Sequence, residues 1–376
     1  MPPRLCGKGV GAEAVTVAGV SAGNAENIRS VVAFFSALMA ELAKSYRGGS
    51  GAYVYMRLSV FSEIASAIFF CIFGIIKGAY NIMKNTVFTG AATAIVTPLT
   101  RDGIDYEQFG RLIDWQIAEG IDAIVTVGTT GEGSTLTDEE HKEAIRFTVE
   151  RVAGRVPVIA GTGSNDTAYA IELTKYAEAA GADAMLLVTP YYNKATQKGL
   201  IESFRAIADA TTKPCILYNV PSRTGCNLLP ASVKELAKHP NIVAIKEACG
   251  NISQIAELAA LVGDEIDIYS GNDDQIVPIM SLGGKGVISV LSNIMPRETV
   301  KICRDFEAGN VKAAREAQLR LLPLINALFC EVNPIPAKAA VAAMGFCENY
   351  LRLPLTPMEP ENEKKLLALM RDEGII

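Results

Sequence analysis

Asn241-Ile-Val-Ala-Ile-Lys-Glu-Ala-Cys249 decides the fold, because a short aliphatic run ends there in a single lysine. Residues 242–245 have the composition of a buried strand, and polar residues resume just after Lys246. A lysine buried among aliphatic side chains is costly as an ammonium, so desolvation lowers its pKa and leaves an amine that attacks carbonyls. The alternative for an isolated lysine is a strand-end residue whose charge reaches solvent. The rest of the sequence shows whether Lys246 stands alone.

From Asn85 onward, short β-branched or aliphatic runs alternate with amphipathic helical patterns. Eight strands are predicted, at 92–96, 123–127, 156–160, 184–188, 215–218, 243–246, 266–269 and 286–290. Helical patterns lie between them, among them 106–119, 138–153, 167–180 and 253–262. This alternation predicts an α/β fold of parallel strands joined by crossover helices, namely a (β/α)8 TIM barrel over residues 85–309. Short β-branched runs typical of strands become rare after residue 309, and residues 310–376 are predicted to form a C-terminal helical region.

Residues 1–84 differ in composition from the remainder, with no Asp, four Glu and eight Lys or Arg. Residues 28–44 have a helical pattern, and the apolar run 64–76 is shorter than the ~20 residues that cross a bilayer. We interpret residues 1–82 as an upstream addition outside the core, with Met83 as an internal start. An organelle transit peptide and a membrane tether are the alternatives.

Composition excludes several classes of function. A net charge of −6 without a basic tract argues against nucleic acid as a partner and favours a soluble small-molecule protein. We expect no membrane partner, because the run 64–76 is too short to span a bilayer, and we expect a cytoplasmic location. The eight cysteines form no Cys-x-x-Cys pair, and the two histidines, His141 and His239, are far apart in sequence. A zinc site or a Ser-His-Asp triad is therefore poorly supported.

Polar residues follow several predicted strands at the end of the barrel where such enzymes build their sites. They lie in Gly128-Thr-Thr-Gly-Glu-Gly133, Thr189-Pro-Tyr-Tyr-Asn193, Tyr218-Asn-Val-Pro-Ser-Arg-Thr-Gly225 and Lys246-Glu247. We expect these segments to bring hydroxyls, phenols, a guanidinium and an amine to one rim. Neither Gly128–Gly133 nor Gly161-Thr-Gly163 is followed by the Lys-Ser/Thr of a phosphate-binding P-loop.

A neutral Lys246 amine at such a rim forms a carbinolamine and then a Schiff base with a ketone or 2-oxo acid. Tyr218 can transfer the protons that this step needs, with Thr129 and Tyr192 relaying them to solvent. Each residue also has a purely structural interpretation. Tyr218 can be a core phenol, Arg223 a surface ion-pair residue, and Thr129 a turn residue. Glu132 and Glu247 are assigned structural roles only.

Taken together, these motifs resemble those of the 4-hydroxy-tetrahydrodipicolinate synthase (dihydrodipicolinate synthase) family. This family belongs to the pyruvate-dependent class I aldolase superfamily, which also contains N-acetylneuraminate lyase. The resemblance runs from about Thr86 to the C-terminus, with several separated motifs in the same order and spacing. It implies a lyase of the hydro-lyase class that condenses pyruvate with L-aspartate 4-semialdehyde in lysine and diaminopimelate biosynthesis. It implies no metal and no organic cofactor.

The resemblance also assigns roles to residues. Its catalytic residues match Lys246 as the Schiff-base lysine, Tyr218 as the proton-transferring tyrosine, and Thr129 and Tyr192 as relay residues. Its substrate-binding residues match Thr130, which holds the pyruvate carboxylate, Arg223, which receives the semialdehyde carboxylate, and the backbone of Gly271 and Ile288. Tyr192 is inserted into the partner's site in the family, which implies a homo-oligomer, at least a dimer and in its usual form a tetramer.

Two positions depart from the lysine-inhibited members of the family. A glutamate that helps hold the inhibitor's ammonium is replaced by Tyr169, and a histidine is replaced by Asp138, whereas His141 and Asn165 are kept. We therefore predict weak or absent feedback inhibition by lysine.

Two alternative functions remain open. The first is another 2-oxo-acid aldolase of the same superfamily, similar to N-acetylneuraminate lyase, which usually lacks an arginine at the position of Arg223 and has serine at that of Thr129. The second is a non-catalytic barrel that serves as a binding or scaffold protein.

Overall fold

The computed structural model describes residues 86–376. The predicted helix at 28–44, the apolar run at 64–76 and the proposed start at Met83 lie outside these residues. The domain boundaries predicted at 84/85 and 309/310 stay predictions.

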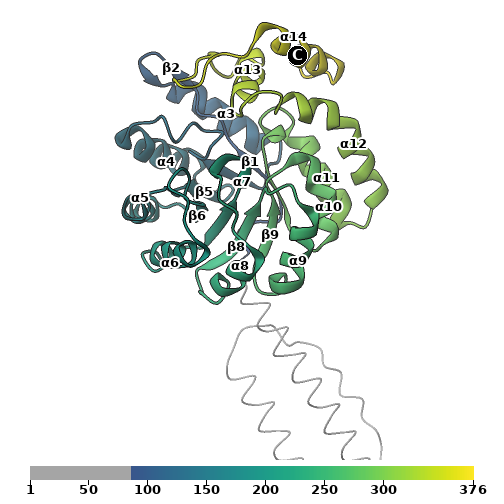
Figure 1. Cartoon of the computed structure of the whole chain (residues 1–376). Coiled ribbons are helices and arrows are strands. Elements are labelled where there is room, and N and C mark those ends of the chain that lie inside the picture. The colour runs from purple at the N-terminus through teal and green to yellow at the C-terminus, as the bar shows by residue number, and fades with distance from the viewer. Residues whose placement is uncertain (1–85) are drawn as a thin grey trace, which may run out of the picture. The chain divides into compact units, whose positions relative to one another are not determined.

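Eight parallel strands form a closed barrel, as predicted (Figure 1). In chain order they are β1 (Gly90–Ala94), β4 (Ala123–Thr126), β5 (Val158–Gly161), β6 (Ala184–Val188), β7 (Cys215–Asn219), β8 (Ile242–Glu247), β9 (Asp267–Ser270) and β10 (Gly286–Ser289). Each strand pairs with the next, and β1 closes the barrel by pairing with both β4 and β10. The predicted strands all exist, and their ends differ from the prediction by two residues at most.

The crossover helices surround the barrel (Figure 1). They are α3 (Tyr106–Ala118), α4 (Asp138–Val152), α5 (Thr167–Ala179), α6 (Gln197–Ala208), α8 (Pro230–Leu236), α9 (Ile252–Val262), α10 (Ile276–Ser281) and α11 (Pro296–Glu307). The capping box of α4 is present, since Thr137 Oγ1 accepts from Glu140 N and Thr137 N donates to Glu140 Oε2. Pro230 occupies the first turn of α8, where its missing N–H costs no hydrogen bond.

Several short elements interrupt this pattern. The single turn α7 (Pro221–Thr224) follows β7, and two short 3-10 helices, η1 (Asp273–Gln275) and η2 (Leu291–Asn293), follow β9 and β10. A small antiparallel hairpin, β2 (Leu99–Thr100) with β3 (Gly103–Ile104), lies outside the barrel.

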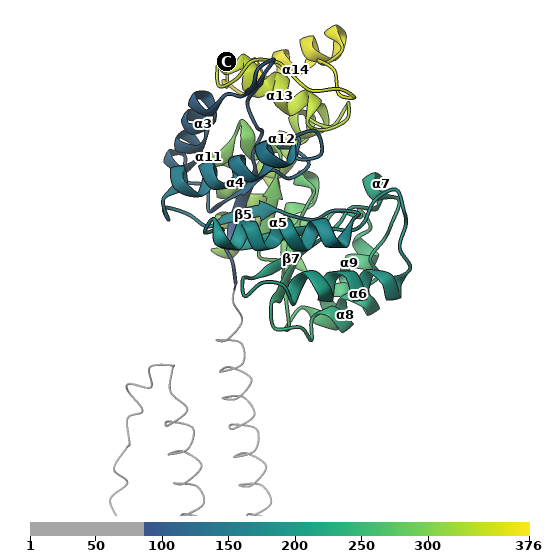
Figure 2. The ribbon, with the colours of Figure 1, turned by 90° about the vertical axis from the view of Figure 1, so that its left-hand side faces the viewer.

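The residues after α11 form helices α12 (Val311–Ala327), α13 (Ile335–Ala343) and α14 (Pro360–Asp372). They pack together, with α14 against both α12 and α13, and α12 against α11. Both views place α13 and α14 on the side of the barrel opposite α6 and α8 (Figures 1 and 2). The segment between α12 and α13 nevertheless reaches the barrel's polar rim, where Asn333 contacts Thr130 and Arg223.

Strand alternation divides the apolar core into two layers. One layer fills the barrel interior, and Ile216, Tyr218, Ala244 and Ile288 belong to it. The other lies between the strands and the surrounding helices, and neighbours such as Leu217 belong to it. The direction of each side chain at the end of a strand therefore follows from its place in this alternation.

No helix among residues 86–376 has the length and apolarity needed to cross a membrane.

Candidate active site

Lys246 lies at the end of β8, on the face of the strand that points into the barrel. It follows Ala244, an interior residue, by two positions, and Ile245 between them belongs to the outer core layer. In the β7–β8 pairing Lys246 lies opposite Tyr218. The Lys246 Nζ atom lies 4.3 Å from the centroid of the Tyr218 ring. The two residues proposed for covalent and proton-transfer chemistry are thus in contact.

The Lys246 amine is almost fully removed from water, with 5% of the residue exposed. Burial lowers the pKa of Lys246 to about 7, the carboxylate of Asp273 opposes this shift, and the Arg223 guanidinium adds to it. A substantial fraction of the amine is therefore neutral near neutral pH. A lysine extended into solvent, the structural alternative, does not describe this side chain.

Tyr218 is buried beside Lys246 and connects it to the Gly128–Gly133 loop. Burial raises the pKa of the Tyr218 phenol, whereas Arg223 and a hydrogen bond with the Thr129 side chain favour its phenolate. Thr129 itself is exposed. The arrangement links a phenol whose ring packs against the amine to a hydroxyl at the surface.

Gly271 packs against the lysine, and Ile288 lies in the barrel interior on β10. A Cβ atom on Gly271 would lie 3.1 Å from Lys246 Cε and 2.7 Å from Ala248 Cβ, so the position has no room for a side chain. Ile288 is fully buried in the interior layer that also contains Tyr218. Gly271 therefore shapes the space around the lysine side chain, and Ile288 fills part of the barrel interior.

A cavity of about 470 Å³ opens beside this group. Thr129, Tyr218 and Arg223 line one part of it, and His141 and Tyr169 line another. Lys246 is not among the lining residues, and neither are Thr130, Tyr192, Gly271 and Ile288. Tyr218, which contacts Lys246, is therefore the link between the cavity and the amine.

Thr130 and Arg223 are brought together by a residue that the sequence did not single out, Asn333. Thr130 is buried, and its Oγ1 atom accepts a hydrogen bond of 3.0 Å from Asn333 Nδ2. Arg223 is exposed, and its guanidinium donates to the Asn333 carbonyl oxygen at 3.2 Å. The side chains proposed to bind two different carboxylates thus share one neighbour.

Tyr192 is not brought into this group. The residue is 90% exposed, its backbone has a φ of 70°, and its side chain does not line the cavity. Its neighbour Tyr191 lines the cavity instead. Within one chain, Tyr192 therefore presents its phenol outward.

Asp273 is a second residue that the sequence interpretation missed. It is 1% exposed, and its Oδ2 atom accepts hydrogen bonds from the backbone N–H groups of Val290 and Leu291, at 3.0 and 2.9 Å. Burial raises the pKa of the Asp273 carboxyl, while nearby Lys246 lowers it. Asp273 lies in the segment that follows β9, at the end of the barrel where the other polar residues gather. This position in the sequence could have identified it.

Glu247 follows Lys246 but has a different environment. Both of its carboxylate oxygens accept from Asn219 Nδ2 at 3.1 Å, and one also accepts from Cys249 N at 2.8 Å. These contacts agree with the structural role that the sequence interpretation gave to Glu247.

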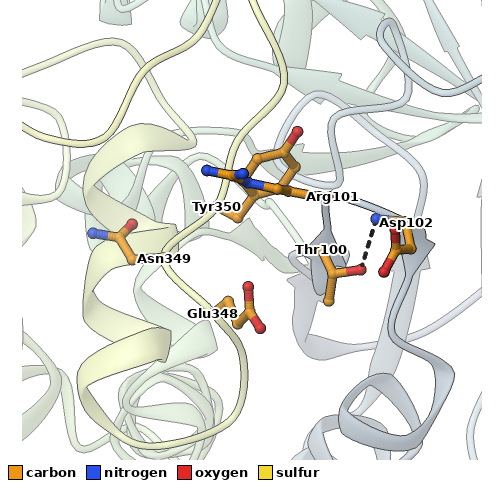
Figure 3. Close-up of a pocket in the computed structure, with 6 residues that line it drawn as sticks. All are labelled: Thr100, Arg101, Asp102, Glu348, Asn349 and Tyr350. Carbon is orange, nitrogen blue, oxygen red and sulfur yellow. Dashed lines mark hydrogen bonds between the residues drawn. The ribbon is translucent and has the colours of Figure 1, made fainter.

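A second cavity, of about 440 Å³, lies between the β2–β3 hairpin and the segment after α13 (Figure 3). Figure 3 shows its lining residues, which are Thr100, Arg101, Asp102, Glu348, Asn349 and Tyr350. None of the predicted site residues borders it. We assign it no part in the chemistry.

Acidic, histidine and cysteine side chains form no cluster suited to a metal ion within the described residues.

Comparisons of the sequence and of the structure with known proteins indicate the same family. The model of the dihydrodipicolinate synthetase family matches residues 87–373. The 4-hydroxy-tetrahydrodipicolinate synthase of Acetivibrio thermocellus is 55% identical over 294 residues, which cover 78% of this chain and 100% of that protein.

Two solved structures are similar over the same part of the chain. The dihydrodipicolinate synthase of Acinetobacter baumannii, complexed with pyruvate, is 44% identical with a TM-score of 0.76 and covers 77% of this chain and 100% of its own. The enzyme from Cyanidioschyzon merolae with lysine bound is 42% identical, with a TM-score of 0.75 and coverages of 78% and 100%.

Proposed function

Because the chain belongs to the dihydrodipicolinate synthetase family, we propose that it is a 4-hydroxy-tetrahydrodipicolinate synthase that condenses pyruvate with L-aspartate 4-semialdehyde. The observation that carries the proposal is the buried Lys246 amine, whose pKa is lowered to about 7 and whose Nζ atom lies against the Tyr218 ring. The pyruvate complex of the Acinetobacter baumannii protein supports the choice of 2-oxo acid.

The first half of the reaction uses Lys246 and Tyr218. The neutral amine adds to C2 of pyruvate to give a carbinolamine, and loss of water from it gives a Schiff base. Loss of a proton from C3 then gives an enamine, because the protonated imine accepts the electron pair of the broken C–H bond. Tyr218 carries these protons, and its contact with Lys246 and its hydrogen bond with Thr129 support this role.

The second half forms the carbon–carbon bond. The enamine carbon attacks the aldehyde carbon of L-aspartate 4-semialdehyde, and the amino group of that substrate then displaces Lys246 from the imine carbon. The ring closes and the enzyme amine is released, with one water lost overall. This loss of water assigns the reaction to the carbon–oxygen lyases.

The substrate carboxylates need separate partners. Thr130 is assigned to the carboxylate of pyruvate and Arg223, at the cavity, to that of the semialdehyde. Arg223 is also the residue that argues against a neuraminate lyase type of acceptor. A panel of aldehydes with and without a carboxylate tests this, since an Arg223→Ala variant should lose its preference for the carboxylated aldehyde.

Incubation with pyruvate and borohydride, followed by peptide mass mapping, tests the proposal as a whole. Reduction of the Schiff base fixes the pyruvate carbons on the lysine, so we expect the added mass on Lys246. A Lys246→Met variant is the matched control and should stay unmodified. If wild-type protein takes up no pyruvate, the chain is not this enzyme, and an adduct on another lysine would overturn the assignment of Lys246.

Assembly and location are part of the proposal. The 90% exposure of Tyr192 supports insertion of its phenol into a partner's site, and hence a homo-oligomer of at least two chains, with a tetramer as the expected form. A cytoplasmic location stays a prediction.

A further inference from the structure

Asn333 lies outside the barrel, in the segment between α12 and α13, yet its side chain is buried at the rim. Only 5% of the residue is exposed. Its amide nitrogen Nδ2 donates to Thr130 Oγ1 at 3.0 Å, and its backbone carbonyl accepts from Arg223 at 3.2 Å. One residue of the C-terminal region therefore touches both proposed carboxylate-binding side chains by chemically different groups.

A buried ion pair fixes this segment against the same loop. Lys338, one turn into α13, is fully buried, and its Nζ atom lies 2.7 Å from Glu132 Oε1 and donates to the Thr97 carbonyl at 2.6 Å. Glu132 follows Thr130 by two residues. The position of Asn333 relative to Thr130 is thus determined by several contacts rather than by its own hydrogen bond alone.

The direction of the Asn333–Thr130 hydrogen bond has a chemical consequence. A threonine hydroxyl has one proton to donate and two lone pairs that accept. Because the amide N–H occupies a lone pair, the hydroxyl proton of Thr130 stays available for another acceptor. A carboxylate can only accept, so it binds best to a hydroxyl whose proton is still available.

We propose that Asn333 is a positioning residue that sets the polarity of the Thr130 hydroxyl, so that Thr130 donates its proton to the carboxylate of the 2-oxo acid. The proposal rests on the proposed function, because it needs Thr130 to bind that carboxylate. Asn333 acts through Thr130 and need not touch the substrate.

Three substitutions at this position separate polarity from packing. Asn333→Asp keeps the shape of the side chain but replaces the N–H donor by a carboxylate oxygen. This oxygen accepts a hydrogen bond from the Thr130 hydroxyl, whose proton is then no longer available to the substrate. Asn333→Ala removes the contact, and Asn333→Leu keeps most of the volume without a hydrogen bond. All three retain the backbone carbonyl that accepts from Arg223.

The measurement is the dependence of Lys246–pyruvate adduct formation on pyruvate concentration, together with the KM for the semialdehyde. We expect Asn333→Ala and Asn333→Leu to raise the half-saturating pyruvate concentration about 10-fold, and Asn333→Asp to raise it about 100-fold, as expected when hydrogen bonds to a charged group are lost. The KM for the semialdehyde should change less than about twofold, because the Arg223 contact is to the backbone. In a Thr130→Val background, Asn333→Ala should not raise the half-saturating pyruvate concentration any further.

The outcomes are distinct. Asn333→Asp binding pyruvate as well as wild type would overturn the proposal, since the amide oxygen would then face Thr130. If the half-saturating pyruvate concentration and the KM for the semialdehyde rise equally, Asn333 has only a structural role. The same holds if a lower melting temperature of Asn333→Leu accounts for all of its weaker pyruvate binding. Failure of wild-type protein to form any adduct would refute the proposed function instead of this inference.

Discussion

Lys246 experiences two opposing influences whose balance sets its reactivity. Burial disfavours the ammonium, and the Asp273 carboxylate favours it. Asp273 is itself held by two backbone N–H groups from the segment after β10, so its place near the amine does not depend on Lys246. Because the pKa of Lys246 remains about 7, burial has the larger effect.

This balance predicts the pH dependence of adduct formation. Above the pKa the amine is neutral and attacks pyruvate, whereas below it the ammonium has no lone pair to donate. The rate of borohydride-trapped adduct formation should therefore rise with pH and level off above about 7. Asp273→Asn removes the carboxylate that favours the ammonium, so its midpoint should move to lower pH. Asp274→Asn, at the exposed neighbouring position, is the control and should leave the midpoint unchanged. A wild-type rate that keeps rising to the pKa of free lysine would contradict the assignment.

Tyr169 and Asp138 predict the response to lysine. The Tyr169 hydroxyl donates to Asp138 Oδ1 at 3.0 Å, and Lys142 Nζ donates to Asp138 Oδ2 at 2.7 Å. The Asp138 carboxylate is therefore already paired with a cation of the chain, and Tyr169 lines the cavity with a phenol where an acidic group would hold an ammonium. Millimolar L-lysine should change the initial rate less than about twofold, because neither Tyr169 nor Asp138 offers its ammonium groups an unpaired carboxylate.

Two variants sharpen this measurement. Tyr169→Glu places a carboxylate at the cavity and should increase inhibition by lysine, whereas Tyr169→Phe removes only the hydroxyl and should not. Strong inhibition of the wild-type enzyme would show that other groups bind the effector.

At the scale of elements, one buried charge pair joins α13 to the barrel. Lys338 and Glu132 are both fully buried, and their contact joins α13 to the loop after β4. Lys338→Met leaves the Glu132 carboxylate buried without its cation, which should lower the free energy of unfolding by about 3–5 kcal/mol. Urea denaturation measures this change. The double variant Glu132→Gln/Lys338→Met should recover part of the loss.

Lys312 provides the matched control. It forms a helical pair with Glu316 in which both side chains are mostly exposed. Lys312→Met should therefore leave the urea midpoint nearly unchanged. An equal effect of the two lysine substitutions would show that helix propensity, and not the buried pair, determines the loss.

The sequence predicted the elements better than it predicted the contacts between them. Alternating apolar patterns placed all eight strands, because each strand is specified by neighbouring residues. Asn333, in contrast, meets Thr130 across 203 residues of chain, and no local pattern encodes that encounter. Lys338 gave a partial signal, as a lone cation in the apolar helix Ile335–Ala343, which predicts a partner without identifying it.

At the scale of the whole molecule, one chain supplies Lys246, Tyr218, Thr129 and Thr130 to a common rim but directs Tyr192 away from it. A tyrosine with 90% of its surface exposed on a left-handed backbone is poorly placed to serve its own site. The same exposure suits a side chain that a partner buries. Each active site would then be made by two chains, and activity would depend on assembly.

Complementation between two impaired variants tests this arrangement. Lys246→Met should abolish adduct formation, and Tyr192→Phe should slow turnover about 100-fold through loss of a proton-relay hydroxyl. In a dimer of one chain of each kind, one site has neither group, while the other combines Lys246 of one chain with Tyr192 of its partner. Co-assembled chains should therefore regain close to half of the wild-type activity per dimer. Wild-type chains paired with the double variant Lys246→Met/Tyr192→Phe are the control, because there both sites lack one group and activity should fall. If the single variants do not complement and the control pair keeps half of its activity, Tyr192 serves its own chain.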